Sequence, residues 1–203
     1  MNYDKALDEL IGTFTTRPTL LLHACCAPCS SSVIERLAPY FNITVLFYNP
    51  NIEPFEEYET RKEELIRLLD IMKIKYINAI YDNDEWHECI KGLEEEKERG
   101  KRCYACYQKR LEYTAKTAKK YNYDYFGTTL TLSPFKVAEW INEIGYDLEK
   151  KYKVNYMPSD FKKQNGYKRS IELSNQYGLY RQNYCGCIYS KENRYNSLNS
   201  SKP

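Results

Sequence analysis

Most cysteines in this sequence lie in groups whose spacing suits metal binding. Eight cysteines occur, and three segments hold all but one of them: Cys25-Cys26-Ala27-Pro28-Cys29, Cys103-Tyr104-Ala105-Cys106 and Cys185-Gly186-Cys187. In Cys26/Cys29 and in Cys103/Cys106, two residues separate the thiols, so one turn of chain brings both sulfurs to one metal ion or one cluster. The sequence therefore predicts a centre ligated by cysteine sulfur.

The spacing leaves two kinds of centre open. A structural zinc ion held by the two cysteine pairs is the simpler one. The adjacent residues Cys25 and Cys26 fit poorly on one tetrahedral ion, whereas they can reach two irons of a cubane. The chain also has more thiols than one zinc ion uses, and surplus thiols beside a metal indicate redox chemistry. We therefore favour an iron–sulfur cluster and keep zinc as the alternative.

The remaining cysteines have different predicted roles. Glycine between Cys185 and Cys187 relaxes the backbone and permits a redox disulfide or two ligands to a second metal. A buried structural pair is the plainer alternative. Cys89 stands alone in a charged segment, and we expect it to be an isolated thiol.

Composition indicates a single globular protein of the cytoplasm. The chain has 203 residues and a net charge of +2, which does not by itself indicate a nucleic-acid-binding protein. It contains no apolar run long enough to span a membrane, and residues 1–17 lack the apolar core of a secretion signal. In a reducing compartment such cysteines are more often metal ligands or redox groups than structural disulfides. Residues 97–110 are locally basic, which is consistent with a basic face or with an ordinary solvated helix.

Strands and helices alternate along the predicted chain. Apolar runs predict strands at 19–24, 43–48, 77–81 and 123–129, and helical patterns lie between them. Ser133-Pro134 predicts the start of a further helix, and Gly178 ends the last one. This order is typical of an α/β domain with a mostly parallel sheet, which binds ligands at the carboxyl ends of its strands. Cys25 and Cys26 directly follow the first strand, so we expect the metal site at that edge.

The predicted domain organisation has three parts. We expect an N-terminal leader helix over 1–17, an α/β iron–sulfur reductase domain over 18–190, and a flexible tail over 191–203.

Several motifs, in order, resemble the QueH-type epoxyqueuosine reductases. They run from about His23 to Ser190: His23-Ala24-Cys25-Cys26-Ala27-Pro28-Cys29-Ser30, Tyr48-Asn49-Pro50-Asn51-Ile52, Glu57-Tyr58 with Arg61, Cys103-x-x-Cys106-Tyr107, Arg110-Leu111, Thr128-Thr129-Leu130, Ser133-Pro134, Asp160-Phe161-Lys162-Lys163 and Tyr180-Arg181-Gln182-Asn183-Tyr184-Cys185-Gly186-Cys187.

The resemblance implies a fold, a reaction and a cofactor. The fold would be of the nucleotide-hydrolase-like (HUP) α/β class. The reaction would be the two-electron reduction of epoxyqueuosine to queuosine in the tRNA anticodon loop, the last step of queuosine synthesis. A [4Fe-4S] cluster would be held by Cys25, Cys26, Cys103 and Cys106, with Cys29 as a further candidate ligand. Cys185 and Cys187 would form a catalytic redox pair or help to hold a second mononuclear metal, iron or zinc.

Other residues are candidates for proton transfer and substrate binding. An unidentified electron donor is required, and Tyr107, Tyr184 or Glu57 is a candidate proton donor. Candidate phosphate contacts are Arg61, Lys101, Arg102, Arg110, Lys162 and Arg181. Asp160 is a candidate for binding a ribose or cyclopentane diol, or a metal.

Two other functions compete with the reductase. One is a zinc-stabilised nucleic-acid-binding module. The other is a nucleotide-dependent tRNA thiolase. Residues 25–30 replace the Gly- and Ser-rich turn that would bind pyrophosphate in such a thiolase, and this argues against ATP use.

Overall fold

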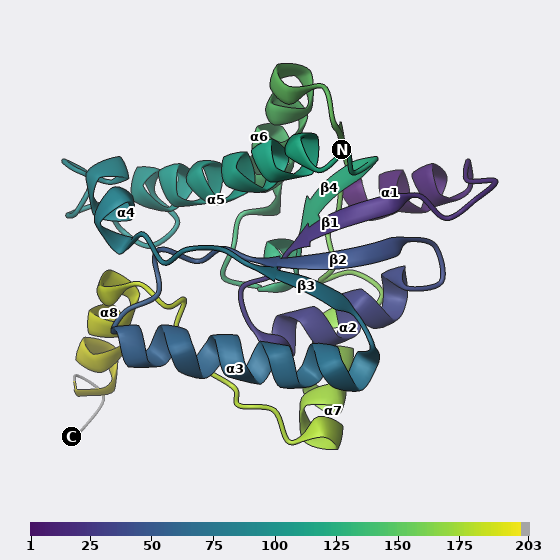
Figure 1. Cartoon of the computed structure of the whole chain (residues 1–203). Helices are drawn as coiled ribbons and strands as arrows, with labels where there is room; N and C mark the ends of the chain where they lie inside the picture. The colour runs from purple at the N-terminus through teal and green to yellow at the C-terminus, as the bar shows by residue number, and fades with distance from the viewer. Residues whose placement is uncertain (200–203) are drawn as a thin grey trace.

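A single parallel sheet organises the molecule. The computed structural model describes the backbone of residues 1–199 and the side chains of residues 1–193. Five strands lie in the order β3-β2-β1-β4-β5, and every neighbouring pair is parallel (Figure 1). The strands are β1 (Thr19–His23), β2 (Asn42–Phe47), β3 (Lys75–Asn78), β4 (Tyr125–Thr128) and β5 (Asn155–Tyr156). The predicted α/β class is confirmed. The sequence missed β5, because two residues carry no readable periodicity.

Helices cover both faces of the sheet. They are α1 (Tyr3–Ile11), α2 (Ala27–Leu37), α3 (Phe55–Met72), α4 (Asn83–Cys89), α5 (Lys101–Lys120), α6 (Ala138–Tyr152), α7 (Gly166–Tyr177) and α8 (Ile188–Asn199), with a 3₁₀ turn at Leu130–Leu132. In Figure 1, α5 and α6 lie on one face of the sheet and α2, α3 and α7 on the other.

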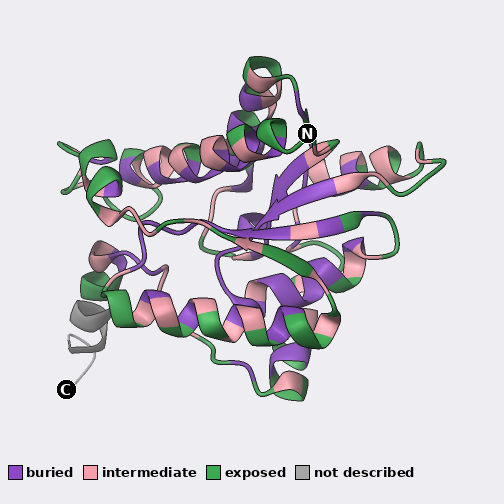
Figure 2. Ribbon diagram, viewed as in Figure 1, coloured by how far each residue is buried: buried purple, intermediate pink, exposed green. Residues whose placement is uncertain are grey.

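Side-chain alternation along β1 builds a separate core on each face. Leu20 and Leu22 pack with the α2 and α3 side chains, whereas Leu21 packs with those of α5 and α6. Successive strand residues point to opposite faces, so this short apolar run supplies both cores. Figure 2 shows β1 and β2 largely buried and the edge strand β3 largely exposed.

The strand order creates a crevice beside β1. The chain passes from β1 outward through β2 and β3, and then returns to place β4 on the other side of β1. In such sheets, ligands bind outside the carboxyl ends of the strands where the order reverses. Cys25 and Thr129 follow the ends of β1 and β4, and the Thr129 N–H donates to the His23 carbonyl at 2.9 Å.

One predicted helix start is wrong. Helix α6 begins at Ala138, and Ser133 instead accepts a hydrogen bond from the Phe135 N–H at 3.3 Å. The Arg99 guanidinium donates to the carbonyl oxygens of Pro134 and Phe135, at 2.5 and 3.3 Å. These contacts hold residues 133–137 as a loop, so a cap-like Ser-Pro pair does not start a helix here.

The ends of the chain differ in detail from the predicted segments. Helix α1 stops at Ile11, and its Leu7 is buried in the core. The predicted boundary at residue 190 falls inside α8, and residues 200–203 of the predicted tail lie outside the described residues. The division into leader, domain and tail stays a prediction. Within residues 1–199, no helix is long and apolar enough to cross a membrane.

Candidate metal centre and active site

Three cysteines meet at the start of α2. The Sγ atoms of Cys25, Cys26 and Cys29 all lie within 4.8 Å of one another, and those of Cys25 and Cys26 are 3.6 Å apart. Cys26 precedes α2, and Cys29 lies in its first turn. The exposed N–H groups of a helix N-terminus favour negative charge, so this position stabilises thiolates. The three sulfurs form a compact set of soft ligands.

The trio already favours one ionised sulfur. Hydrogen bonds from the Cys26 and Cys29 thiols hold the pKa of Cys25 well below its usual range. The same contact with Cys25 raises the pKa of Cys26 to about 12. These contacts favour ionisation of Cys25 over that of Cys26.

His23 stabilises the edge of the sheet at which these cysteines lie. It is fully buried, and its Nε2–H donates to the Tyr48 carbonyl at 3.0 Å. Its Nδ1 accepts from the Thr128 hydroxyl at 2.9 Å. Burial and the charge of Arg110 lower the pKa of His23 to about 3. Both ring nitrogens are occupied, so this neutral histidine joins β1, β2 and β4 and is not a free metal ligand.

Cys103 and Cys106 reach the same edge from α5. Cys103 packs in the core cluster that contains Cys25 and Cys26, whereas Cys106 packs with Trp86, Ile90 and Cys187. Within the described chain, neither joins a group of three His, Cys, Asp or Glu ligand atoms at the 4.8 Å spacing of the Cys25 trio. The predicted ligands thus share one edge but do not form a closed set, and the ligand assignment stays a prediction.

Cys185 and Cys187 form a second thiol pair, in the loop before α8. Both are free thiols. The hydrogen bond from Cys187 and the charge of Lys136 keep the pKa of Cys185 well below its usual range, despite burial, while the pKa of Cys187 is raised. The Lys136 ammonium donates to Cys185 Sγ at 3.1 Å. The redox role of this thiolate–thiol pair stays a prediction.

The backbone of this loop is fixed from α3. Arg61 is almost fully buried and donates to the Cys185 carbonyl at 3.1 Å, while its Nε pairs with Glu57 at 2.7 Å. Gly186 has φ of +122°, and an added Cβ would lie 2.9 Å from Ile52 and 3.0 Å from Arg61. Only glycine fits this close approach without strain.

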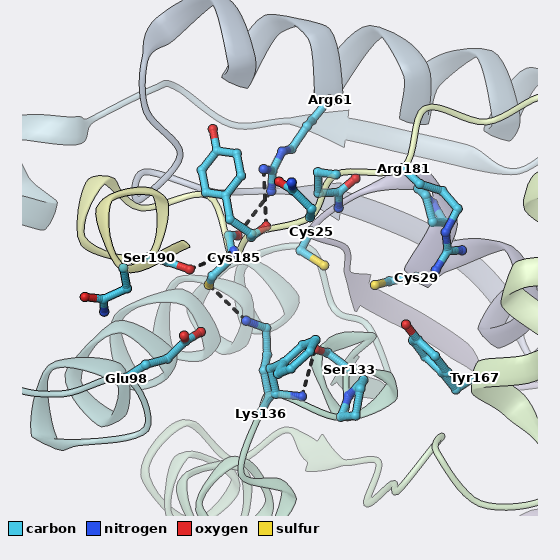
Figure 3. Close-up of a pocket in the computed structure, with 17 residues that line it drawn as sticks. Cys25, Cys29, Arg61, Glu98, Ser133, Lys136, Tyr167, Arg181, Cys185 and Ser190 are labelled. Carbon is cyan, nitrogen blue, oxygen red and sulfur yellow. Dashed lines mark hydrogen bonds between the residues drawn. The ribbon is translucent and has the colours of Figure 1, made fainter. Parts of the chain in front are cut away.

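A cavity of about 580 Å³ opens onto both thiol groups. Figure 3 shows Cys25 and Cys29 beside each other at its centre, with Cys185 and Lys136 on another wall. The Tyr167 hydroxyl points toward Cys29 in the same view. The volume is within the usual range for a small-molecule or nucleoside site.

The charges around the cavity fit an anionic, sulfur-ligated group. Arg110 is 1% exposed, and its Nε and Nη1 have no hydrogen-bond partner among the described residues. Burial disfavours its charge, but the nearby Cys106, Cys25 and Cys185 outweigh this and raise the pKa of Arg110. Lys136 adds a second cation at Cys185. Iron–sulfur centres ligated by thiolates are anionic, so the donor set and the surrounding cations both suit one.

Several predicted substrate or proton contacts are engaged elsewhere. The Tyr184 hydroxyl donates to the Glu53 carbonyl at 3.1 Å, and Glu57 pairs with Arg61. Burial raises the pKa of Tyr107 beyond its usual range. Asp160 pairs with Lys162 at 2.9 Å and does not line the cavity. These arrangements do not favour Tyr184, Glu57, Tyr107 or Asp160 as direct substrate contacts.

The predicted phosphate contacts divide by burial. Arg61, Arg102 and Arg110 are buried and bind protein groups. Arg181 is exposed and lines the cavity, and its Nη1 also donates to the Ser170 carbonyl at 3.3 Å and the Ser174 hydroxyl at 2.9 Å. Sequence reasoning missed Lys136 and Phe135, because it assigned residues after Ser133 to a helix. It also missed Tyr167, for which no sequence signal exists.

Comparisons with known proteins identify the family. A sequence model of the family "Epoxyqueuosine reductase QueH" matches residues 20–193. The chain belongs to the epoxyqueuosine reductase QueH family. QueH of Staphylococcus aureus is 46% identical over 201 residues, which cover 94% of this chain and 84% of that protein. QueH of Thermotoga maritima is 38% identical over 177 residues, which cover 85% of this chain and 90% of that protein. The predicted resemblance is confirmed.

Solved structures show the fold of this QueH-family chain. The U34-tRNA thiolase NcsA from Methanococcus maripaludis, solved with its [4Fe-4S] cluster, has a TM-score of 0.57 and 16% identity, covering 99% of this chain and 73% of that one. A predicted subunit of a tRNA methyltransferase from Methanocaldococcus jannaschii has a TM-score of 0.50 and 16% identity, covering 77% and 76%. At this identity the likeness concerns the fold alone. It confirms the predicted α/β fold class.

Proposed function

We propose that this chain reduces epoxyqueuosine to queuosine in the anticodon loop of tRNA, the last step of queuosine biosynthesis. The observation that carries the proposal is family membership over nearly the whole chain, including 46% identity to an epoxyqueuosine reductase. The thiol-lined cavity agrees with it, because epoxide reduction needs a redox group open to a bulky substrate. The cytoplasm, where tRNA is found, is the expected place of action.

A [4Fe-4S] cluster is the proposed cofactor. Cys25, Cys26, Cys103 and Cys106 would hold it, and when bound it supplies electrons one at a time. Cys29 is the further candidate ligand, since its sulfur lies in the compact trio. Cys185 and Cys187, with Cys29, would act beside it as a redox pair or as ligands of a second iron or zinc ion.

The residues of the chain have distinct proposed tasks. Converting an epoxide to an alkene consumes two electrons and two protons and releases water. An electron donor must therefore supply two electrons for each turnover, and this donor is unidentified. Lys136 stabilises negative charge at Cys185. Arg181 at the cavity margin is placed to contact RNA phosphate, and the exposed rings of Phe135 and Tyr167 offer faces for stacking a splayed base.

The first experiment measures the metal. Chain purified and reconstituted without oxygen should be brown, with broad visible absorption and about four irons per chain. The second measures the reaction: tRNA from a strain that lacks this gene, and has no other reductase, should accumulate epoxyqueuosine. Normal queuosine in that strain would refute the assignment, whatever metal the chain holds.

One observation favours the zinc alternative. The Cys25–Cys26 sulfur distance of 3.6 Å is close to the edge of a tetrahedral zinc site, about 3.8 Å for bonds of about 2.3 Å. A zinc-stabilised nucleic-acid-binding module would be colourless after reconstitution, with about one zinc and no iron per chain. It would bind tRNA without changing it.

A further inference from the structure

Arg110 lies on the same face of α5 as two of the proposed cluster ligands. It follows Cys106 by four residues and Cys103 by seven, and these spacings return to one face of a helix. The side chain is 1% exposed. A guanidinium is always charged, so this position holds a permanent buried cation at the cysteine-rich edge of the sheet.

An amide oxygen fixes one end of the guanidinium, and the other end lies near sulfur. Nη2 donates to Asn49 Oδ1 at 2.5 Å, and Asn49 Nδ2 in turn donates to the Ala24 carbonyl at 2.8 Å. Arg110 is thus joined to the residue that immediately precedes Cys25. Its Nε and Nη1 have no hydrogen-bond partner within the described chain. Buried donors without partners are rare in proteins, and an unpaired buried charge is strongly destabilising.

Among the described side chains, no carboxylate pairs with this charge. Arg110 forms no salt bridge with any residue that the structure describes. The adjacent His23 is held neutral by its two hydrogen bonds, and Lys136 is another cation. The nearby groups that can carry negative charge are sulfurs, those of Cys25, Cys106 and Cys185.

We propose that Arg110 is a positioning residue whose free N–H groups donate to sulfur of the proposed cluster and raise its reduction potential. This inference rests on the proposed function for the cluster itself. Each reduction adds one negative charge to the centre. A fixed cation in a low-dielectric interior stabilises that added charge, and hydrogen bonds to sulfur act in the same direction.

The test is a redox titration of the reconstituted full-length chain without tRNA. Electron paramagnetic resonance monitors the reduced cluster during the titration. Arg110→Lys keeps the charge but not the planar donor geometry, and Arg110→Met removes both. With iron per chain unchanged, the midpoint potential should fall in the order wild type, Arg110→Lys, Arg110→Met.

The matched control is Arg102→Met. Arg102 is also a buried arginine of α5, but its guanidinium binds the Glu94 carbonyl and covers the Tyr189 ring, with its carbon 4.2 Å from the ring centroid. This variant should titrate close to wild type.

The outcomes separate the two proposals. An unchanged potential in Arg110→Met with full iron overturns the role of Arg110. Loss of the cluster in both Arg110 variants also overturns it, because the residue would then only maintain the fold. A wild-type chain that takes up no cluster overturns both proposals. A normal titration series in a chain that cannot reduce epoxyqueuosine overturns the function and leaves Arg110 standing.

Discussion

The ammonium of Lys136 lies 3.1 Å from the sulfur of Cys185, in the wall of the cavity that also contains Cys25 and Cys29. Lys136 comes from the loop before α6, and Cys185 from the loop before α8. This contact joins two segments about fifty residues apart and sets the charge of the cavity wall. A lysine in contact with a thiol favours its ionised, nucleophilic form.

Lys136→Met should therefore make Cys185 less reactive. In the metal-free, reduced protein, loss of the ammonium should raise the pKa of Cys185 and leave less thiolate at neutral pH. Alkylation of Cys185 by iodoacetamide, followed by mass spectrometry, should slow by roughly three- to fourfold for each unit by which the pKa rises above the working pH, because a more basic thiolate is also more nucleophilic. Lys109→Met is the control, since Lys109 pairs with Glu85 at 2.9 Å. An unchanged rate in Lys136→Met would show that Lys136 does not tune this thiol.

Alanine variants of single cysteines should reveal the cluster ligands. After anaerobic reconstitution, Cys103→Ala should lose most of its iron, whereas Cys29→Ala should keep about four irons per chain. Cys89→Ala is the control, because Cys89 is exposed and, among the described residues, hydrogen-bonds only to the Ala105 carbonyl. The reverse pattern, with Cys29 required and Cys103 dispensable, would assign the ligands to the compact trio instead.

Cys185→Ser should separate electron storage from turnover. If Cys185 acts beside the cluster, the variant keeps wild-type iron and visible absorption but loses epoxyqueuosine reduction. Absorption measures the first property, and nucleoside analysis of tRNA by mass spectrometry measures the second. Iron content that falls together with activity would make Cys185 a ligand of the cluster.

Phe135→Ala should weaken RNA binding. The Phe135 ring is 55% exposed at the cavity margin, and two hydrogen bonds from Arg99 hold its loop. Loss of one stacked base should weaken binding of a queuosine-containing anticodon stem-loop by roughly tenfold, given about 1–3 kcal/mol per stack. Fluorescence anisotropy at fixed salt measures this, since phosphate contacts vary with ionic strength. Phe55→Ala is the control, because Phe55 is 52% exposed but does not line the cavity. Equal losses in both variants would argue against stacking at Phe135.

His23 should make the fold sensitive to acid. Its folded pKa is about 3, whereas an unfolded histidine titrates near 6.5. Below about pH 6.5 the unfolded chain binds a proton that the folded chain does not, so stability falls with falling pH until about pH 3. The loss is at most about 1.4 kcal/mol per pH unit in this window.

Urea unfolding of the metal-free protein at pH 7 and pH 5 measures this loss. Carboxylates also respond to acid, so His23→Gln, which retains hydrogen-bonding capacity, provides the comparison. Its free energy of unfolding should depend less on pH than that of the wild type. Identical pH dependence would show that His23 is not the source.

The sequence by itself determined the family, the α/β class and the grouping of the cysteines into segments. The motifs around Cys25, Cys103 and Cys185 lie in one chain order, and the apolar run 19–23 predicts a buried parallel strand. These properties can be read from the sequence because they depend on the spacing and periodicity of residues along the chain.

Only the tertiary structure decided which side chains meet. Lys136 reaches Cys185, and Arg110 lies among sulfurs with no salt bridge to any described residue, because strand order and helix packing bring distant segments to one edge. It also showed that Arg61 and Glu57 hold a loop and are not free for substrate. Such contacts depend on three-dimensional distance and on burial. The residues next to each position in the sequence do not reveal either. In the structure, three of the eight thiols meet at the start of α2 and two lie in the loop beside Lys136. Two more lie on α5, and one cysteine is isolated.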